Sequence, residues 1–208
     1  MVTTAKTFLA QGKRYMQVNE FLSHHLSRAG YVDVQLIRTP IGTRVIIYAE
    51  RPAMVIGKRG RTVKELTAIL EKRFGIENPQ IDVVEIPNPE LNAKIMAYRI
   101  ARSLRRGVKF RRAAFIALRR IMEAGALGAE VIISGKLTSQ RARSEKFTMG
   151  IILKSGEPRK VLVDEAAIPV LLKPGVYGVK VRIMKPIKLP DRIEIKAKKE
   201  EVEAIGAT

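Results

Sequence analysis

The spacing of apolar and polar residues changes several times along the chain, and these changes predict an α+β protein. From about Thr3 to Arg28 apolar residues recur at helical spacing, with Val18, Leu22 and Leu26 near one face. Gly30 supplies a stop signal for this helix. The chain therefore begins with one long amphipathic helix.

Strand-forming runs come next and alternate with a second helix. Val32 to Arg38 and Arg44 to Ala49 are rich in β-branched residues, and the Pro and Gly between them predict a β-hairpin. A short helical turn is expected from Arg51, because Pro is favoured at the first helical position. A longer amphipathic helix should cover Arg61 to Phe74, and a third strand Ile81 to Ile86.

A G-x-x-G loop, Gly57-Lys58-Arg59-Gly60, lies between the short helical turn and the longer helix. The two glycines let the backbone turn at little steric cost and approach a ligand closely, while Lys58 and Arg59 bring positive charge. The order helix, strand, strand, short helix, loop, helix, strand resembles a type II KH domain, whose loop clamps about four nucleotides. We expect residues 1–87 to form this RNA-binding domain, with a three-stranded sheet. Packing of the loop against a protein remains the alternative.

Pro87-Asn88-Pro89 predicts a stiff boundary, and the composition changes directly after it. From Lys94 to Met122 there are ten Lys or Arg residues and no Asp or Glu. A helix expected over Leu91 to Arg106 gathers its apolar residues on one side. The other side carries Lys94, Arg99, Arg102, Arg105 and Arg106. Like charges repel unless a polyanion neutralises them, so this face predicts phosphate binding rather than plain solvation.

A second basic helix is expected from about Phe110 to Ala124, preceded by Lys109. Its packed stripe should be Ala114, Phe115, Leu118, Ile121 and Met122. Arg111 and Arg112 stand at its start, where the helix dipole disfavours cations, and this local conflict indicates a function. Arg112 and Arg119 are seven residues apart and therefore lie on one line, which can follow a strand of phosphates.

The remainder of the chain predicts a small, mostly antiparallel sheet. Strands are expected over Glu130 to Leu137, Arg143 to Lys154, a shorter piece near Val161, and Val176 to Met184. Together with the two basic helices they form an expected α+β domain over residues 88–190. Its first hairpin adds four basic positions, although an ordinary solvated surface fits them equally well: Lys136, Arg141, Arg143 and Lys146. Residues 191–208 are charged and poor in core residues, and predict a tail.

Charge and composition narrow the class of partner. The chain has 39 Lys and Arg against 20 Asp and Glu, a net charge of +19, which favours a polyanion such as nucleic acid. No apolar run reaches the roughly 18 residues of a membrane span, and the start lacks a signal peptide, so we expect a cytoplasmic protein.

The same inventory argues against catalysis. The chain has no cysteine, and His24 and His25 are its only histidines, so no metal site or cofactor is expected. No P-loop and no Ser, His and Asp arrangement is visible, so we assign no catalytic residue and no small-molecule substrate.

Three further motifs carry a resemblance over residues 5–188. They are Pro87-Asn88-Pro89-Glu90-Leu91-Asn92-Ala93, Lys109-Phe110-Arg111-Arg112-Ala113-Ala114 and Ser134-Gly135-Lys136-Leu137. With the KH pattern, the chain resembles the family of the third protein of the small ribosomal subunit. Its motifs are closer to those of archaeal and eukaryotic members than to those of bacterial ones.

That resemblance implies binding to small-subunit rRNA in the head, beside neighbouring small-subunit ribosomal proteins, along the channel through which mRNA enters. It implies that Arg111 and Arg112 face incoming mRNA and support its unwinding without an ATPase. Bacterial relatives place a lysine three positions after the second arginine, where this chain has Phe115. Arg119 can partly replace that contact.

Two alternatives belong to other functional classes. A free-standing KH regulator of RNA would be absent from ribosomal subunits. A DNA-repair lyase or nuclease would act through a lysine or the N-terminal amine. A ribosomal protein should instead sediment with small subunits through a salt wash.

Overall fold

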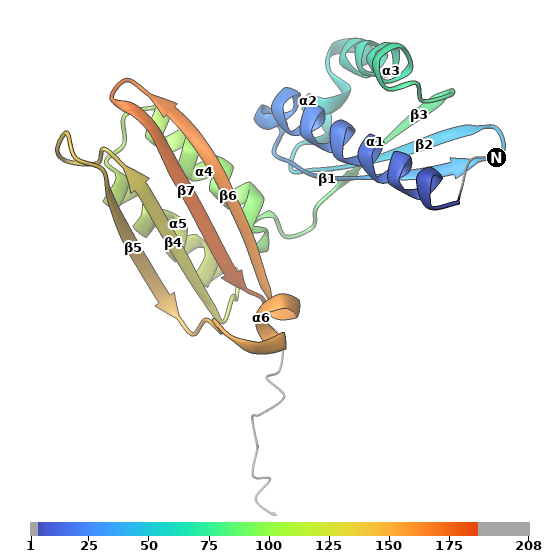
Figure 1. The fold of residues 1–208 in the computed structure, drawn as a ribbon. Helices are drawn as coiled ribbons and strands as arrows, with labels where there is room; N and C mark the ends of the chain where they lie inside the picture. The colour runs from blue at the N-terminus through green and yellow to red at the C-terminus, as the bar shows by residue number, and fades with distance from the viewer. Residues whose placement is uncertain (1–3, 187–208) are drawn as a thin grey trace, which may run out of the picture.

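The N-terminal domain is a three-stranded sheet with helices on one face (Figure 1). The computed structural model describes residues 4–186, so the predicted tail 191–208 lies outside the described residues. In chain order the domain contains α1 (Thr4–His25), the 3-10 turn η1 (Ser27–Ala29), β1 (Tyr31–Thr39), β2 (Gly42–Ala49), α2 (Pro52–Ile56), η2 (Lys58–Gly60), α3 (Arg61–Phe74) and β3 (Pro79–Glu85). The predicted order of elements is confirmed.

The order of its strands places the G-x-x-G loop in a crossover. β1 pairs antiparallel with β2, and β2 pairs parallel with β3. Parallel neighbours cannot be joined by a tight turn, so the chain must cross over between β2 and β3. α2, η2 and α3 form that crossover, and the loop lies between the two helices.

The core of this domain lies between the sheet and the apolar faces of its helices. Val18 and Leu22 of α1, Ile47 of β2, and Leu66 and Leu70 of α3 are all buried. These are positions that the helical and strand periods predict. The first half of α1, residues 5–17, is exposed throughout, because only its second half lies over the core.

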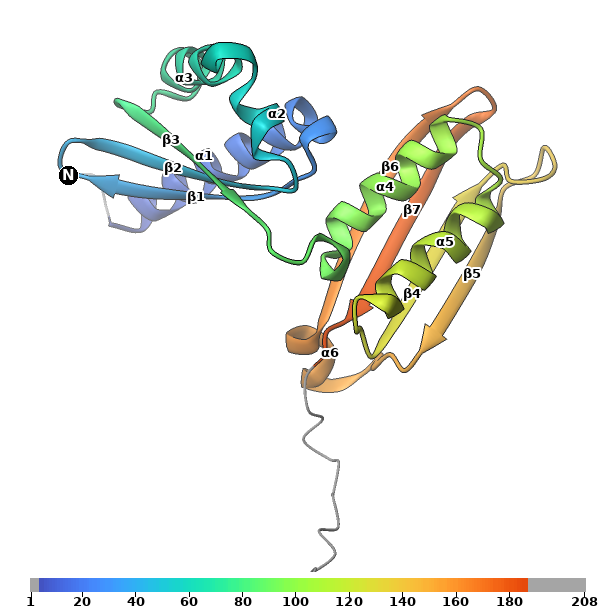
Figure 2. The same ribbon diagram turned by 180° about the vertical axis from the view of Figure 1, so that it is seen from behind.

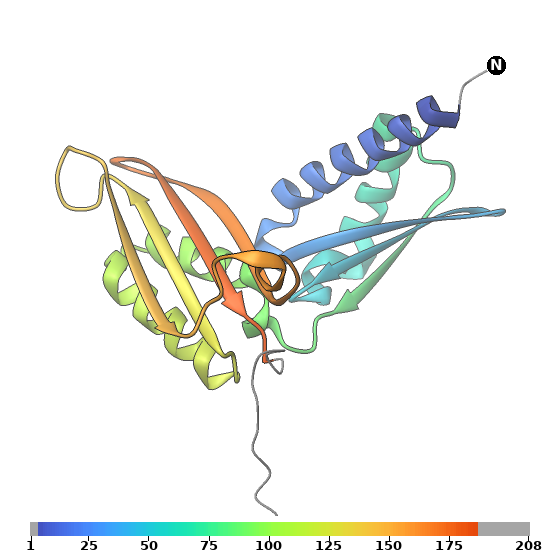
Figure 3. The same ribbon diagram turned by 60° about the horizontal axis from the view of Figure 1, so that its bottom comes forward.

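The C-terminal domain is a four-stranded antiparallel sheet with two helices on one face (Figure 2). It follows the turn η3 (Pro89–Leu91) and contains α4 (Ala93–Arg105), α5 (Phe110–Glu123), β4 (Gly128–Gly135), β5 (Arg143–Gly150), α6 (Gly156–Leu162), β6 (Val163–Leu172) and β7 (Gly175–Met184). The strand order is β5-β4-β7-β6, so β4 and β7 are the central strands. Figure 3 shows that the helices of each domain cover one face of its sheet and leave the other uncovered.

Two side chains fix where α4 begins. The Asn92 side chain accepts hydrogen bonds from the backbone N–H groups of Lys94 and Ile95, which caps the helix. The backbone N–H of Ala93 donates to Asp164 of β6 at 2.9 Å. The start of α4 is therefore held both by its own cap and by the edge of the sheet.

The sequence-based prediction is wrong for one part of this domain. A strand was expected near Val161, but the chain forms the short helix α6 there and enters β6 only at Val163. β6 is an edge strand, with one face uncovered, so it lacks the apolar pattern of a buried strand and tolerates Pro169. β4 begins at Gly128, two residues before the strand predicted from Glu130.

Candidate nucleic-acid interface

The G-x-x-G loop has the backbone geometry that its glycines predict. Gly57, Arg59 and Gly60 all have positive φ, at 72°, 54° and 71°. A Cβ on Gly57 would lie 2.1 Å from the Thr62 hydroxyl oxygen, so no larger residue fits there without rearrangement. Among the residues that the structure describes, the exposed side chains of Lys58 and Arg59 make no ion pair. The loop thus presents two unpaired cations on a constrained backbone.

Most of the predicted basic residues of the C-terminal domain gather at one end of it. The turn between α4 and α5 lies at the same end as the loop between β4 and β5 (Figures 1 and 2). This end carries exposed cations from three segments of the chain, namely Arg105, Arg106, Lys109, Arg111, Arg112, Lys136, Arg141 and Arg143. The fold therefore brings together residues that are 38 positions apart in sequence, from Arg105 to Arg143.

The two arginines at the start of α5 have different surroundings. Arg111 donates two hydrogen bonds of 3.2 Å to the Glu145 carboxylate on β5, and its guanidinium lies 5.7 Å from the centre of the Phe110 ring. The hydrogen bonds to Glu145 raise the pKa of Arg111. Arg112 is exposed, and within residues 4–186 it has no carboxylate partner. Arg112 therefore offers a free guanidinium, whereas Arg111 is held against the sheet.

Arg119 continues the line that Arg112 begins. Both side chains are exposed on α5, and the described part of the chain gives Arg119 no ion pair either. Seven residues of α-helix separate them by about 10 Å along the axis. Two unpaired guanidinium groups thus stand on the outer surface of one rigid helix.

Phe115 does not belong to the packed stripe that the periodicity predicts. Ala114, Leu118 and Ile121 are buried as expected, but 55% of Phe115 is exposed. Its ring contacts Phe147 of β5, with 5.4 Å between the ring centres. The apolar stripe of α5 is therefore narrower than the sequence suggests, and includes Ala113 and Ala117 instead.

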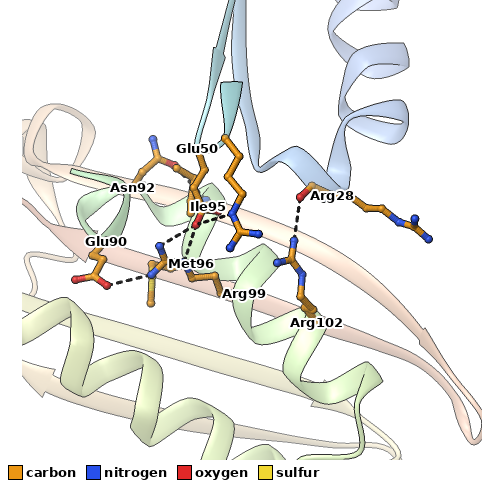
Figure 4. A network of polar contacts seen from close by, with 9 residues as sticks. Arg28, Glu50, Glu90, Asn92, Ile95, Met96, Arg99 and Arg102 are labelled. Atoms are coloured by element: carbon orange, nitrogen blue, oxygen red, sulfur yellow. Dashed lines mark hydrogen bonds and ion pairs between the residues drawn. The ribbon is translucent and has the colours of Figure 1, made fainter. Parts of the chain in front are cut away.

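Arg99 lies away from the basic end, at the contact between the two domains (Figure 4). It donates to the Glu50 carboxylate, which follows β2, at 2.9 Å and to Glu90 at 3.1 Å. Burial lowers the pKa of Arg99, but the hydrogen bonds to Glu50 and Glu90 outweigh this effect and raise it. Arg99 belongs to the helix face predicted to bind phosphate, but its charge is already paired with two carboxylates from outside the helix.

Three more side chains of α4 reach the N-terminal domain. Arg102 donates to the backbone carbonyl of Arg28 at 3.0 Å, and Tyr98 to that of Ser23 at 3.4 Å. The Lys94 ammonium donates to the Val32 carbonyl at 2.6 Å. It also lies 4.6 Å from the centre of the Tyr31 ring. Burial lowers the pKa of this ammonium. No pattern in the sequence indicates these contacts.

A cleft of about 1130 Å³ lies between the two domains beside these contacts. The end of α1 and η1 form one wall, and α4 with the edge strand β6 forms the other. Cations on both walls include Arg28, Arg51, Arg105 and Arg106. Among described residues, Arg105 and Arg106 have no ion-pair partner. The cleft can therefore accommodate a polyanion between the domains.

The uncovered face of the C-terminal sheet carries paired charges. Glu130 of β4 is only 1% exposed and lies within ion-pair distance of Lys146, Lys154 and Arg182. Burial raises the pKa of Glu130, but the nearby ammonium groups of Lys154 and Lys146 outweigh burial and lower it. These cations are already neutralised in part, unlike Arg112 and Arg119.

Residues 4–186 contain neither a helix long and apolar enough to cross a membrane nor a cluster of three or more His, Asp or Glu side chains suited to a metal ion.

Comparison with family models gives two matches that together cover most of the chain. Residues 17–91 match the model described as KH domain. Residues 100–183 match the model described as ribosomal protein S3, C-terminal domain. The two matched regions correspond to the two sheets of the structure.

Comparison with individual proteins gives matches over nearly the full length. The chain is 64% identical over 196 residues to the small ribosomal subunit protein uS3 of Thermofilum pendens, which covers 94% of this chain and 97% of the relative. It is 54% identical over 196 residues to the protein of the same name from Sulfurisphaera tokodaii, covering 94% and 87%. The match to that of Sulfolobus acidocaldarius is 52% over 206 residues, covering 99% and 89%.

Proposed function

The chain belongs to the family of small ribosomal subunit protein uS3, and from this premise we propose that its basic surfaces hold two RNAs, the small-subunit rRNA and the mRNA that enters the subunit. As a ribosomal protein it works in the cytoplasm, within the small subunit. Its part there is structural and RNA-binding, not enzymatic.

The outer face of α5 is the proposed mRNA surface. The observation that supports it is the pair of exposed guanidinium groups of Arg112 and Arg119, which have no ion-pair partner within residues 4–186 and stand about 10 Å apart along one helix. A guanidinium donates two parallel hydrogen bonds to a phosphate, and its positive charge does not depend on base identity. Such a face can grip a moving single strand of any sequence. Arg111 and Lys109 add positive charge at the start of the same helix.

The rRNA is proposed to lie against the other cations. The interdomain cleft offers Arg105 and Arg106, and the G-x-x-G loop offers Lys58 and Arg59. At the tip of the β4–β5 hairpin, Lys136, Arg141 and Arg143 add positive charge at the end of the domain that carries Arg105 and Arg106. Arg102 stands on the wall of the cleft, although its donation to Arg28 gives it an internal partner as well. Neighbouring small-subunit proteins are the remaining partners of this assembly.

Small subunits carrying Arg111→Ala with Arg112→Ala test the mRNA assignment. We expect these subunits to assemble normally, because both side chains are exposed, but to lose mRNA faster and to stall at mRNA hairpins. Lys160→Ala with Lys173→Ala is the matched control, because it removes the same charge from exposed positions outside the proposed RNA surfaces. Dissociation of labelled mRNA and progress through a hairpin of defined stability are the measurements.

Two results would contradict the assignment. Subunits with the double arginine replacement could hold mRNA and pass hairpins as the unaltered subunits do. Alternatively, the control could slow translation equally, which would mean that total charge matters and the place on α5 does not. If the chain were released from subunits by a salt wash, a free-standing KH regulator would replace the ribosomal role.

A further inference from the structure

Phe115 stands among the arginines of α5 rather than under them. Arg111 precedes it by four residues, Arg112 by three, and Arg119 follows it by four, so all are its neighbours on the helix surface. More than half of the Phe115 side chain is exposed, at 55%. A large ring in this position interrupts a surface that is otherwise cationic.

Other aromatic residues hold the Phe115 ring in place. The Phe147 ring on β5 meets it at an interplanar angle of 64°, the edge-on arrangement that aromatic pairs prefer. Phe110, which directly precedes Arg111, lies 6.5 Å from Phe147 between ring centres. The hydrogen bonds from Arg111 to Glu145 fasten the same strand to the same helix. The ring is therefore supported from the sheet side while its outer part stays open.

We propose that Phe115 stacks against a base of the mRNA whose phosphates are held by Arg112 and Arg119. This inference rests on the proposed mRNA surface and adds to it a base-contacting site. Aromatic rings bind single-stranded RNA by stacking, which tolerates any base, because every base has a π face. Together, a stacking ring and flanking guanidinium groups grip both parts of a nucleotide without reading its sequence.

The test uses small subunits that carry the full chain with a single replacement. Phe115→Leu keeps an apolar side chain and removes the ring, whereas Phe115→Tyr keeps the ring. Ile116→Ala removes an exposed apolar neighbour that has no ring to stack, and Val161→Ala removes apolar surface on α6, at the other end of the domain. The mRNAs contain 2-aminopurine, whose fluorescence falls on stacking, at successive positions, or an abasic site at the same positions.

We expect unaltered and Phe115→Tyr subunits to quench 2-aminopurine at one register of the mRNA. Phe115→Leu should abolish that quenching and release mRNA about tenfold faster, the effect of losing one stacked base. An abasic site at that register should speed release from unaltered subunits and have no effect on Phe115→Leu subunits. Ile116→Ala and Val161→Ala should behave as unaltered subunits do.

Three outcomes would overturn the stacking site. Phe115→Leu could leave quenching and release unchanged, or the abasic site could have no effect on unaltered subunits. Equal damage from Ile116→Ala and Phe115→Leu, regardless of the base, would mean that an apolar protein surface docks here. If Arg111→Ala with Arg112→Ala still weakens mRNA binding in any of these cases, the arginine surface stands and only the stacking site fails. If both replacements are neutral, both proposals fail.

Discussion

α4 and α5 cover the same sheet and are equally rich in basic residues, yet they use their cations in different ways. Each is an amphipathic helix with four Lys or Arg residues within its bounds. On α4, Lys94, Arg99 and Arg102 bind groups of the N-terminal domain. On α5, Arg111 pairs within its own domain, and Arg112 and Arg119 remain available.

The difference arises from what lies beside each helix. α4 faces the N-terminal domain, whose carbonyl groups and Glu50 carboxylate are natural partners for cations (Figure 4). α5 lies on the far side of α4, where no second domain covers it (Figure 2). Count and spacing of basic residues therefore do not decide whether a helix binds RNA. Its position in the finished fold does.

Arg99→Ala should have the largest effect on stability. The Glu50 side chain is only 11% exposed, and the replacement removes its closest cationic partner. Removing one member of a buried, hydrogen-bonded pair is costly, and for this half-buried case we expect a loss of about 2–3 kcal/mol of unfolding free energy. Urea unfolding followed by circular dichroism measures the change.

Arg105→Ala, on the same helix but exposed and without an ion pair within residues 4–186, is the control. It should change the unfolding free energy by less than about 0.5 kcal/mol. A loss for Arg105→Ala as large as that for Arg99→Ala would contradict the division between internal and available cations.

The combined change Arg112→Ala and Arg119→Ala should weaken RNA binding without affecting stability. Each phosphate contact to a single strand contributes about 0.7 to the slope of log affinity against log salt, so we expect the slope to fall by about 1.4. Titration of a short single-stranded RNA at several KCl concentrations measures the slope. Arg99→Ala should leave the slope unchanged. An equal fall in the slope for Arg99→Ala would mean that the cations of α4 and α5 contribute equally to RNA binding.

Glu145→Gln should have the smallest effect, and it tests whether freeing a cation on α5 strengthens RNA binding. It releases Arg111 from its exposed ion pair, so α5 gains an available cation. Exposed pairs contribute little to stability, so the unfolding midpoint should not change, while affinity for single-stranded RNA should rise about two- to threefold. A fall in affinity would mean that the pair is needed to position Arg111.

Local patterns in the sequence predicted much of the fold because they depend on near neighbours. The helix over Arg61 to Phe74 has the bounds predicted for it, and the apolar side of α4 is buried as the helical period requires. The G-x-x-G loop was visible because positive φ favours glycine at Gly57 and Gly60. For such features the sequence contains most of the necessary information.

What could not be predicted depends on residues far apart in the chain. Arg99 and Glu50 are 49 positions apart, and nothing in either segment indicates the other. Phe115 fits the helical period of a buried residue, and only the position of Phe147 on β5 shows that its ring lies at the rim of the core. The sequence placed a strand near Val161 rather than over Val163–Leu172, because an edge strand with one face uncovered lacks a strong apolar pattern.

The order of strands in the C-terminal sheet has a consequence for synthesis. β7 is the last described strand to be made, yet it lies in the centre of the sheet, between β4 and β6. The N-terminal sheet is complete once Glu85 has left the synthesising ribosome, so that domain can fold first. Until β7 is made, α4 and α5 lack the central strand that they pack against. Their apolar faces are then exposed to water, and their arginine-rich faces to any nearby polyanion. The C-terminal domain can therefore close its core only after Met184, the last residue of β7, has emerged.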